Sequence, residues 1–125
     1  MRYLIDTHVL LWCAQGDESL PSGVRAILSN EECFYSVASL WEVAIKQSIG
    51  KLDVGFSVSE LDMHCREAAL GRLSIEAPHL ERIKTLPDIH RDPFDRLLVA
   101  QALEEGLAIV TCDRMIPQYP VQTIW

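Results

Sequence analysis

Apolar and polar positions along the chain follow two alternating patterns. Short, almost continuously apolar runs predict buried strands at Arg2–Ile5, Cys33–Val37 and Leu107–Val110. Between them lie longer segments in which apolar residues recur every three or four positions, which is the spacing of an amphipathic helix. Strands that alternate with helices in this way predict an α/β fold, with helices packed on both faces of a mainly parallel sheet.

Helix boundaries are indicated by capping residues, prolines and glycines. We expect helices at Thr7–Gln15, Ser22–Ser29, from the cap Ser39 to Gly50, Val58–Ala69, within Pro78–Leu86, and from the cap Asp92 to Gly106. Two weaker segments, Leu73–Glu76 and Val121–Trp125, are expected to add strands. The chain contains no internal repeat, low-complexity tract or Gly/Ser linker, so residues 1–125 are expected to form one domain.

Acidic residues stand at element ends that share one edge of the predicted sheet. Asp6 directly follows the first strand, and Glu42 opens the helix after the second. Asp95 opens the helix that leads into the strand Leu107–Val110, and Asp113 follows that strand. Because ligands of open α/β sheets bind beyond the carboxyl ends of the strands, we expect these four carboxylates to converge on one rim.

Four carboxylates at close range repel one another unless a cation lies between them. Oxygen ligands suit Mg²⁺ or Mn²⁺, and two such ions can activate a water and stabilise the leaving oxygen of a phosphodiester. We expect Asp6 and Asp95 to be direct ligands, because a strand end and a helix start are rigid positions. Glu42 and Asp113 are expected to complete a second ion or to bind through water. Thr111 is expected to position the water or to orient Asp113.

Each acid also has an explanation that needs no metal. Asp6 and Asp95 suit the start of a helix, where a carboxylate caps backbone N–H groups or meets the positive end of the dipole. Glu42 completes a capping box and is spaced to pair with Lys46, and Asp113 is a common turn residue. These explanations do not predict that all four acids share one rim, and that coincidence favours a metal site.

Other residues capable of chemistry form weaker patterns. The histidines lack metal-ligand spacing, and there is no nucleophile elbow, P-loop or GxGxxG motif. The four cysteines form no CxxC pair and are expected to be buried free thiols. Trp12 and Trp41 are expected to pack in the core. Arg91, Arg96 and Arg114 flank the acidic rim, where arginines either hold backbone phosphates or are simply solvated.

Composition narrows the classes of function only slightly. The chain has 125 residues, of which 49% are hydrophobic and 23% charged, as in a globular domain. The net charge of −7 argues against binding nucleic acid through a broad basic surface. It is compatible with a nuclease whose acidic site is neutralised by cations, or with a basic protein partner. The sequence has no membrane-length apolar run and no signal-peptide pattern, so a cytoplasmic location is expected.

Four segments spread over nearly the whole chain form a recognisable pattern. They are LIDTHVLLW at Leu4–Trp12, SVASLWEVAIK at Ser36–Lys46, DPFDRLLVAQA at Asp92–Ala102 and IVTCDR at Ile109–Arg114. In this order and together, they resemble the PIN-domain ribonucleases, in particular the VapC-type toxins of bacterial toxin–antitoxin pairs. Any one of the segments alone would be a weak match, whereas the joint match is specific.

The resemblance implies a Mg²⁺- or Mn²⁺-dependent endoribonuclease, built as a three-layer α/β/α sandwich around a parallel sheet of about five strands. It also implies a homodimer, and a cognate antitoxin whose tail blocks the acidic site. The acidic positions of the family correspond to Asp6, Glu42, Asp95 and Asp113, and its hydroxyl position corresponds to Thr111. The whole chain, residues 1–125, would then be one PIN-like nuclease domain.

Some alternatives stay open at this point. Many PIN domains carry Asn where this chain has His8, so the family's substrate contact does not transfer to that position. Asp92 is a cap, an outer-shell group or a metal ligand. A phosphatase or phosphotransfer domain would use Asp6 as a nucleophile, although no second acid stands at a DxD spacing. A noncatalytic binding module would keep the fold, but would not need all four acids.

Overall fold

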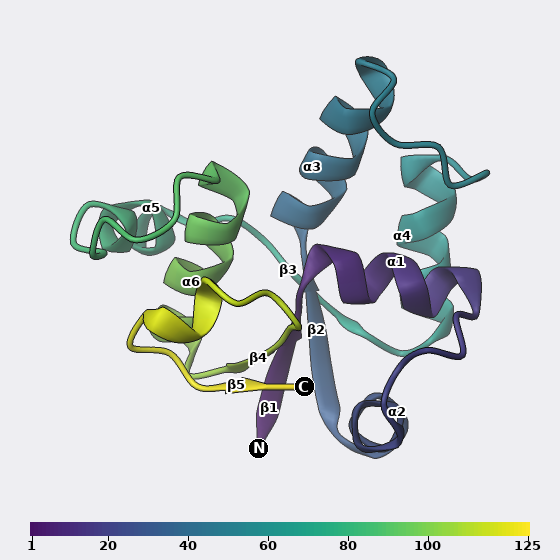
Figure 1. Ribbon diagram of the computed structural model, residues 1–125, viewed down its shortest axis with the longest axis horizontal. Helices are drawn as coiled ribbons and strands as arrows, with labels where there is room; N and C mark the ends of the chain where they lie inside the picture. Colours follow the sequence, from purple (N-terminus) through teal and green to yellow (C-terminus); the bar gives the residue numbers. More distant parts are fainter.

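The centre of the molecule is a five-stranded sheet in the order β3-β2-β1-β4-β5, in which every neighbouring pair of strands is parallel. The computed structural model describes all residues, 1–125. The strands are β1 (Arg2–Ile5), β2 (Glu32–Ser36), β3 (Gly71–Leu73), β4 (Ala108–Val110) and β5 (Thr123–Ile124). The predicted parallel sheet is confirmed, and β1 lies in its middle (Figure 1).

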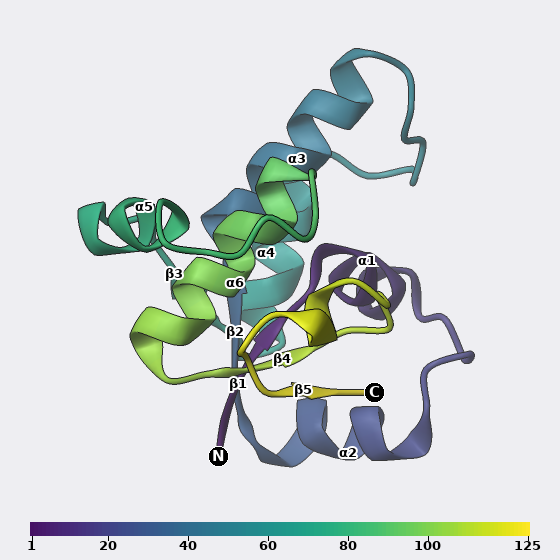
Figure 2. The same cartoon turned by 60° about the vertical axis from the view of Figure 1, so that its left-hand side comes forward.

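Helices connect the strands and cover both faces of the sheet. They are α1 (Thr7–Gln15), α2 (Ser22–Asn30), α3 (Val37–Ser48), α4 (Val58–Glu67), α5 (Ala77–Ile83) and α6 (Pro93–Glu105). The views in Figures 1 and 2 show α1, α2 and α4 on one side of the sheet, and α5 and α6 on the other. This is the expected three-layer α/β/α sandwich. None of these helices combines the length and the apolar character that crossing a bilayer requires.

Alternating strand residues divide the interior into two cores. Ile5, Tyr35 and Val110 face α1, α2 and α4, whereas Leu4 and Ile109 face α6. Successive side chains of a strand point to opposite faces, so a strand covered on both sides must be apolar at every position. This explains the strand sequences without a polar face. It also leaves the ends of the strands as the places where polar side chains can gather.

The start of α3 differs from the prediction. Ser36 ends β2, and its hydroxyl accepts a hydrogen bond from the Ala38 N–H at 3.0 Å, so the helix begins directly after Ser36. Ser39 lies inside the helix, fully buried, where its Oγ accepts a hydrogen bond from Thr7 Oγ1 at 2.8 Å. The predicted capping box of Ser39 and Glu42 is therefore wrong. Glu42 is left without a role in capping the helix.

The third strand also begins earlier than predicted. The segment expected at Leu73–Glu76 overlaps β3 only at Leu73, because Gly71 is already paired with Phe34 of β2. A Cβ at residue 71 would lie 2.6 Å from Cδ1 of the Phe34 ring. Glycine leaves room for the Phe34 ring beside residue 71, so a residue that normally weakens a strand here lets the ring and the strand pairing coexist.

Both tryptophans that were expected in the core are more exposed than predicted. Trp41 is 53% exposed and packs edge-on against Phe94 of α6, with 4.9 Å between the ring centroids. Trp12 is half-buried on α1. The helical spacing of apolar residues identifies the buried stripe of a helix, but it does not show how much of a large ring at the border of that stripe is covered.

The cysteines are free, as predicted, but not all of them are buried. Cys33 and Cys65 are buried, Cys13 is half-buried and Cys112 is exposed. Cys112 lies just beyond the end of β4, where the chain leaves the sheet, and for this reason the apolar run before it does not predict its burial.

Candidate metal centre

Asp6 lies at the carboxyl end of β1, in the middle of the sheet. Its N–H donates to the Val110 carbonyl of β4 at 3.0 Å, which fixes the residue to the neighbouring strand. Although Asp6 precedes α1, its carboxylate accepts no capping hydrogen bond, so the alternative role as a helix cap is excluded. Instead, Thr111 Oγ1 donates to Oδ2 at 2.7 Å, while Oδ1 is buried and receives no hydrogen bond.

Glu42 lies in the second turn of α3 and is as deeply buried as Asp6, each being 2% exposed. Lys46 Nζ donates to Glu42 Oε2 at 2.6 Å, which confirms the predicted pairing along the helix. The other oxygen, Oε1, is buried without a donor. Leaving a buried acceptor without a partner costs about 1–3 kcal/mol, and more when it is charged. Two such oxygens, on Asp6 and Glu42, are therefore available to bind a proton or a cation.

Asp95 is free to face the site because Asp92 caps α6. Asp92 Oδ1 accepts hydrogen bonds from the Phe94 N–H at 2.8 Å and the Asp95 N–H at 3.2 Å, as predicted for this cap. The half-buried Asp95 carboxylate makes none of these capping contacts, and its Oδ2 lies 2.9 Å from Nε2 of His90. Asp92 is therefore a structural cap that also adds negative charge next to Asp95.

Thr111 connects the two acids that follow neighbouring strands. Its hydroxyl donates to Asp6 and accepts a hydrogen bond from the Asp113 N–H at 3.0 Å. Asp113 Oδ1 in turn accepts from the Met115 N–H at 2.7 Å, so the predicted turn role of Asp113 coexists with its place at the rim. One hydroxyl thus orients a carboxylate at the end of β1 and the backbone of a residue beyond β4.

The acids are close enough to change one another's ionisation. Burial and the charges of neighbouring acids raise the pKa of Asp95 to about 8. Those neighbours are Asp6, Asp92, Glu42 and Asp113. Burial is also the main reason that the pKa of Asp6 is raised. Such a cluster either retains a proton at neutral pH or takes up a cation that removes the repulsion.

His90 contacts two of the acids, although its sequence spacing did not predict a role. Nε2 lies 2.9 Å from Asp95 Oδ2 and 3.7 Å from Asp113 Oδ2. The other ring nitrogen, Nδ1, accepts a hydrogen bond from the Asp92 N–H at 3.2 Å. A nitrogen that accepts an N–H carries no hydrogen itself, so the hydrogen of the neutral ring lies on Nε2. The only signal in the sequence was the position of His90 two residues before the cap.

This arrangement makes His90 a hydrogen-bond donor to the acids rather than a metal ligand. Ligand atoms of His90, Asp95 and Asp113 all lie within 4.8 Å of one another, which alone would suit a mixed nitrogen and oxygen site. A metal at Nε2 would require the ring hydrogen on Nδ1, facing the Asp92 N–H, where two donors would meet. The hydrogen bond at Nδ1 therefore argues against metal binding by His90, even though its ring lies close to two acids.

His90→Asn and His90→Gln separate these two roles. Asn keeps an acceptor near the position of Nδ1 but has no donor at the position of Nε2, whereas Gln places an amide donor there. Since groups that orient metal ligands typically contribute about 10–100-fold in metal affinity, we expect His90→Asn to weaken Mn²⁺ binding by that factor and His90→Gln to retain most of it. Calorimetric titration with Mn²⁺ measures both. Equal losses in the two variants would contradict the donor role.

The residues at the rim fit a divalent cation. All four acids have one carboxylate oxygen next to a protein donor: Asp6 by Thr111, Glu42 by Lys46, Asp95 by His90 and Asp113 by the Met115 N–H. The opposite oxygens of Asp6 and Glu42 have no protein partner at all. A set of oriented carboxylate oxygens is the donor set that Mg²⁺ and Mn²⁺ prefer. The structure thus brings all four predicted acids and Thr111 to one rim.

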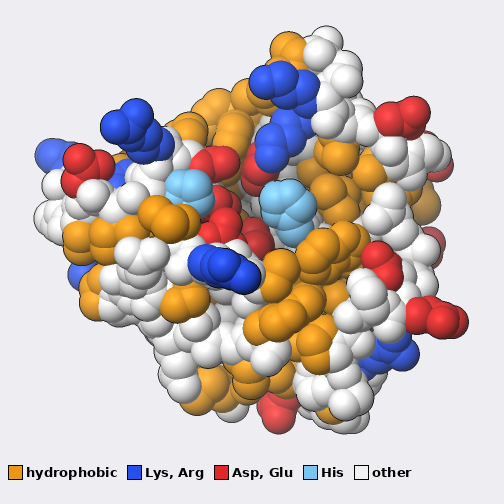
Figure 3. All heavy atoms as spheres, in the orientation of Figure 1, with side chains coloured by type: hydrophobic (Ala, Val, Ile, Leu, Met, Phe, Trp, Pro, Cys, Tyr) orange, Lys and Arg blue, Asp and Glu red, His pale blue; other side chains and the backbone are white.

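The arginines predicted near the rim have different roles. Arg96 donates to the Pro87 carbonyl at 2.9 Å and to the Tyr119 hydroxyl at 3.2 Å, so it braces the loop before α6 and does not face the rim acids. Arg91 and Arg114 are exposed. Figure 3 shows the acidic patch near the centre of this face, between two histidines and bordered by Lys and Arg side chains.

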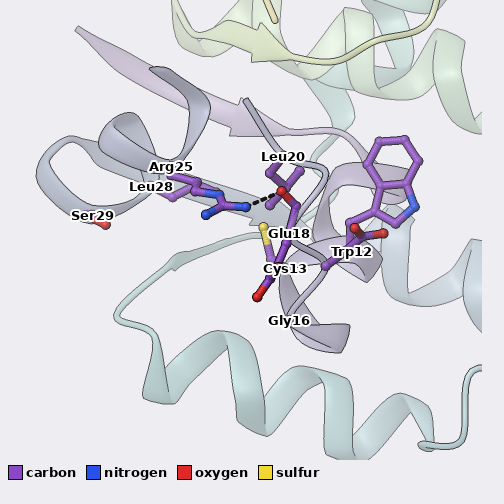
Figure 4. A pocket seen from close by; sticks show the side chains of 9 residues that line it. Trp12, Cys13, Gly16, Glu18, Leu20, Arg25, Leu28 and Ser29 are labelled. Carbon is purple, nitrogen blue, oxygen red and sulfur yellow. Dashed lines mark hydrogen bonds between the residues drawn. The ribbon is translucent and has the colours of Figure 1, made fainter. Parts of the chain in front are cut away.

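The acidic patch is separate from the cavity between α1 and α2. That cavity has a volume of about 360 Å³, and its lining includes Trp12, Cys13, Leu20, Arg25 and Leu28 (Figure 4). Arg25 is held there by the Glu18 carbonyl. None of the four rim acids lines the cavity. The open acidic patch, and not this cavity, is therefore the candidate for chemistry.

Several solved structures share this fold but little sequence. VapBC2 from Rickettsia felis, bound to a DNA fragment from its promoter, has 18% identity and a TM-score of 0.74, covering 100% of this chain and 99% of that chain. FitAcB from Neisseria gonorrhoeae has 16% identity, a TM-score of 0.67 and coverages of 98% and 96%. A toxin–antitoxin complex from Klebsiella pneumoniae has 16% identity, a TM-score of 0.60 and the same coverages. At such identities the likeness establishes the fold.

A family model extends the likeness to the sequence. The model described as PIN domain matches residues 3–122, a range that includes the four acids, His90 and Thr111. No curated protein sequence matches the chain significantly. The resemblance deduced from the four segments is thus confirmed at the level of the family. Because the match spans nearly the whole chain, the chain belongs to the PIN domain family.

Proposed function

We propose that this chain is a Mg²⁺- or Mn²⁺-dependent endoribonuclease that acts as the toxin of a toxin–antitoxin pair. Residues 1–125 would form its one nuclease domain. One observation carries the proposal: Asp6 Oδ1 and Glu42 Oε1 are buried without a hydrogen-bond donor, beside an acid whose pKa is raised to about 8. Buried carboxylate oxygens without partners are stabilised either by a proton or by a cation, and a cation can be shared by both oxygens.

The roles at the rim follow from where each carboxylate is held. Asp6 and Asp95 would bind the cation directly, and Glu42 and Asp113 would complete its shell or bind through water. When bound, the cation supplies an activated water and neutralises charge on the leaving oxygen of a phosphodiester. Thr111 keeps the Asp6 carboxylate in orientation through its 2.7 Å hydrogen bond. No side chain needs to form a covalent intermediate.

RNA phosphates would reach this site despite the acidic charge of the protein. The net charge is −7, so a broad electrostatic attraction to RNA is absent. Arg91 and Arg114 are exposed near the rim and would hold phosphates on either side of the scissile one. Cations bound by the acids would reverse the local field. Binding should therefore depend on the divalent ion more than on the overall charge.

The proposed biological role is based on solved structures that share this fold. The Klebsiella relative is described as a toxin–antitoxin complex. We propose that a cognate antitoxin binds this chain and blocks the acidic site, and that the chain forms a homodimer in the cytoplasm. A net charge of −7 favours an antitoxin with a basic segment. The gene next to the one for this chain is expected to encode it.

The rival functions are less well supported by the contacts at the rim. A phosphotransfer domain would use Asp6 as a nucleophile, but one oxygen of Asp6 is bound by Thr111 and the residue two positions on is His8 rather than an acid. A noncatalytic module has no need for two buried carboxylate oxygens without donors. Trapping a phosphoaspartate at Asp6 would favour the phosphotransfer function.

Removal and return of the metal test the proposed reaction. The purified protein is stripped with a chelator and incubated with single-stranded RNA, and then Mg²⁺ or Mn²⁺ is added back. Cleavage should stop in the chelator and resume with either ion. An Asp53→Asn variant, altered at an exposed acid away from the rim, should behave like the wild type. Cleavage that persists in excess chelator would contradict the metal mechanism.

A further inference from the structure

Trp125 lies at the same edge of the sheet as the acidic rim. It directly follows β5, which pairs in parallel with β4, and the Thr111 N–H donates to the Ile124 carbonyl at 3.0 Å. Parallel strands end at one edge, so the residue after β5 lies close to the residues after β4. Trp125 is 45% exposed there.

Three aromatic rings form a continuous row beginning two residues after Asp6. His8 and Trp12 lie one turn apart on the same side of α1, with ring centroids 6.4 Å apart. The Trp12 ring lies 5.8 Å from that of Trp125, at an interplanar angle of 51°. We call His8, Trp12 and Trp125 the aromatic ledge.

The aromatic ledge is only partly covered by the protein. His8 is exposed and Trp12 is half-buried. In Figure 3 a histidine borders the acidic patch, and an apolar surface continues from it toward the lower right of the view. Large rings that rest on one another and still have open surface are suited to receiving a further flat ring. The ledge therefore offers a stacking surface that starts at the acidic rim.

We propose that the aromatic ledge binds unpaired nucleobases of the RNA substrate, next to the phosphodiester that is cleaved. This inference rests on the proposed ribonuclease function. Proteins hold single strands by stacking bases on aromatic side chains, whereas bases within a duplex are hidden. A base stacked on His8 or Trp12 would bring its own phosphate toward Asp6, and the exposed Arg114 near the rim would contact the neighbouring phosphate. The ledge thereby selects single-stranded RNA.

A protein segment is the competing occupant of the aromatic ledge. The row consists of rings only and is continuous with the metal-binding acids, which favours a nucleic acid strand that must pass both. Trp12 also lines the cavity between α1 and α2, together with the aliphatic side chains of Leu20 and Leu28, but none of the four rim acids lines that cavity. Antitoxin bound to the ledge in place of RNA is the alternative that the experiment distinguishes.

The experiment measures affinity for RNA without cleavage. Asp6→Asn is combined with Trp12→Ala or with Trp125→Ala, and fluorescence anisotropy gives the Kd for a single-stranded oligoribonucleotide and for a duplex of equal length. Stacking contributes about 1–3 kcal/mol per base, so each change should weaken single-strand binding by about 5–150-fold. Duplex binding should be weak and unchanged. Trp12→Phe and Trp125→Phe, which keep a ring, should restore most of the affinity.

Trp41→Ala is the matched control, because Trp41 is also an exposed tryptophan but packs on Phe94 instead of the ledge. Unchanged single-strand affinity in both ledge variants, or an equal loss in Trp41→Ala, would overturn the proposal. So would a loss of antitoxin binding without a loss of RNA binding. Cleavage of RNA by the wild-type protein is measured in parallel. If the wild type cleaves RNA while the ledge variants bind single-stranded RNA normally, only the ledge assignment is wrong. If the wild type neither binds nor cleaves RNA, both proposals are wrong.

Discussion

Asp95→Asn is expected to reduce metal-dependent RNA cleavage by about 10²–10⁴-fold, which corresponds to the several kcal/mol that a catalytic metal contributes. Asn keeps the size and shape of the side chain but removes the charge that would bind the cation. Asp6→Asn should have an effect of similar size, because Asp6 is the other direct ligand that we propose. Initial rates at saturating Mn²⁺, with a fixed RNA substrate, measure both effects.

Two further variants make this expectation specific. Asp92 caps α6 through Oδ1 and is not a proposed direct ligand, so Asp92→Asn should retain most of its stability and most of its cleavage rate. Asn remains a good cap at this position. Asp53→Asn should leave both properties unchanged. If Asp6→Asn and Asp95→Asn cleave as fast as the wild type, the rim is not the catalytic site.

The second large effect is on stability, and it depends on pH. The folded protein raises the pKa of Asp95 from 3.8 to about 8, mainly through burial and then through neighbouring charges. Between these values the folded protein binds the Asp95 proton more tightly than the unfolded chain does. The contribution of Asp95 to stability is therefore complete below pH 4 and is lost as the pH rises through 8.

Without metal, the Tm of the wild type should therefore fall between pH 5 and pH 8. This fall should exceed the fall in the Tm of Asp95→Asn by at least about 5 °C. The Asn variant lacks the charge, so the difference between the two proteins isolates this group. Adding Mg²⁺ or Mn²⁺ should raise the Tm of the wild type strongly at pH 8, weakly at pH 5, and not at all in the variant. If the Tm of both proteins depended on pH in the same way, the raised pKa of Asp95 among the rim acids would be contradicted.

The acidic rim was predictable because it follows from topology. Asp6 and Asp113 come directly after apolar strands, and in a parallel sheet such positions meet without any knowledge of the loops. The pairing of Lys46 with Glu42 was predictable from helical spacing alone. The start of α3 was not, because Ser36 and Ser39 are both good caps in sequence, and only the point where β2 stops being paired decides between them.

The contacts of His90 and of the aromatic ledge could not be predicted from the sequence, because local sequence patterns do not show which distant residues will meet. The ring of His90 reaches Asp95 because the short segment before α6 turns back, with Nδ1 against the Asp92 N–H. Trp12 contacts Trp125, which arrives from the other end of the chain by the β4–β5 pairing. Contacts of this kind exist only once the whole sheet has formed.

The central claim is that the buried acids of the rim bind a divalent cation, and anomalous scattering from a crystal soaked in Mn²⁺ tests it most directly. We predict an anomalous peak within coordination distance of Asp6 Oδ1 and an oxygen of Asp95, with Glu42 Oε1 bound to it directly or through a water. His90 should remain a donor to Asp95, outside the shell of the metal. A soaked crystal with Mn²⁺ bound elsewhere and no peak at this rim would contradict the claim.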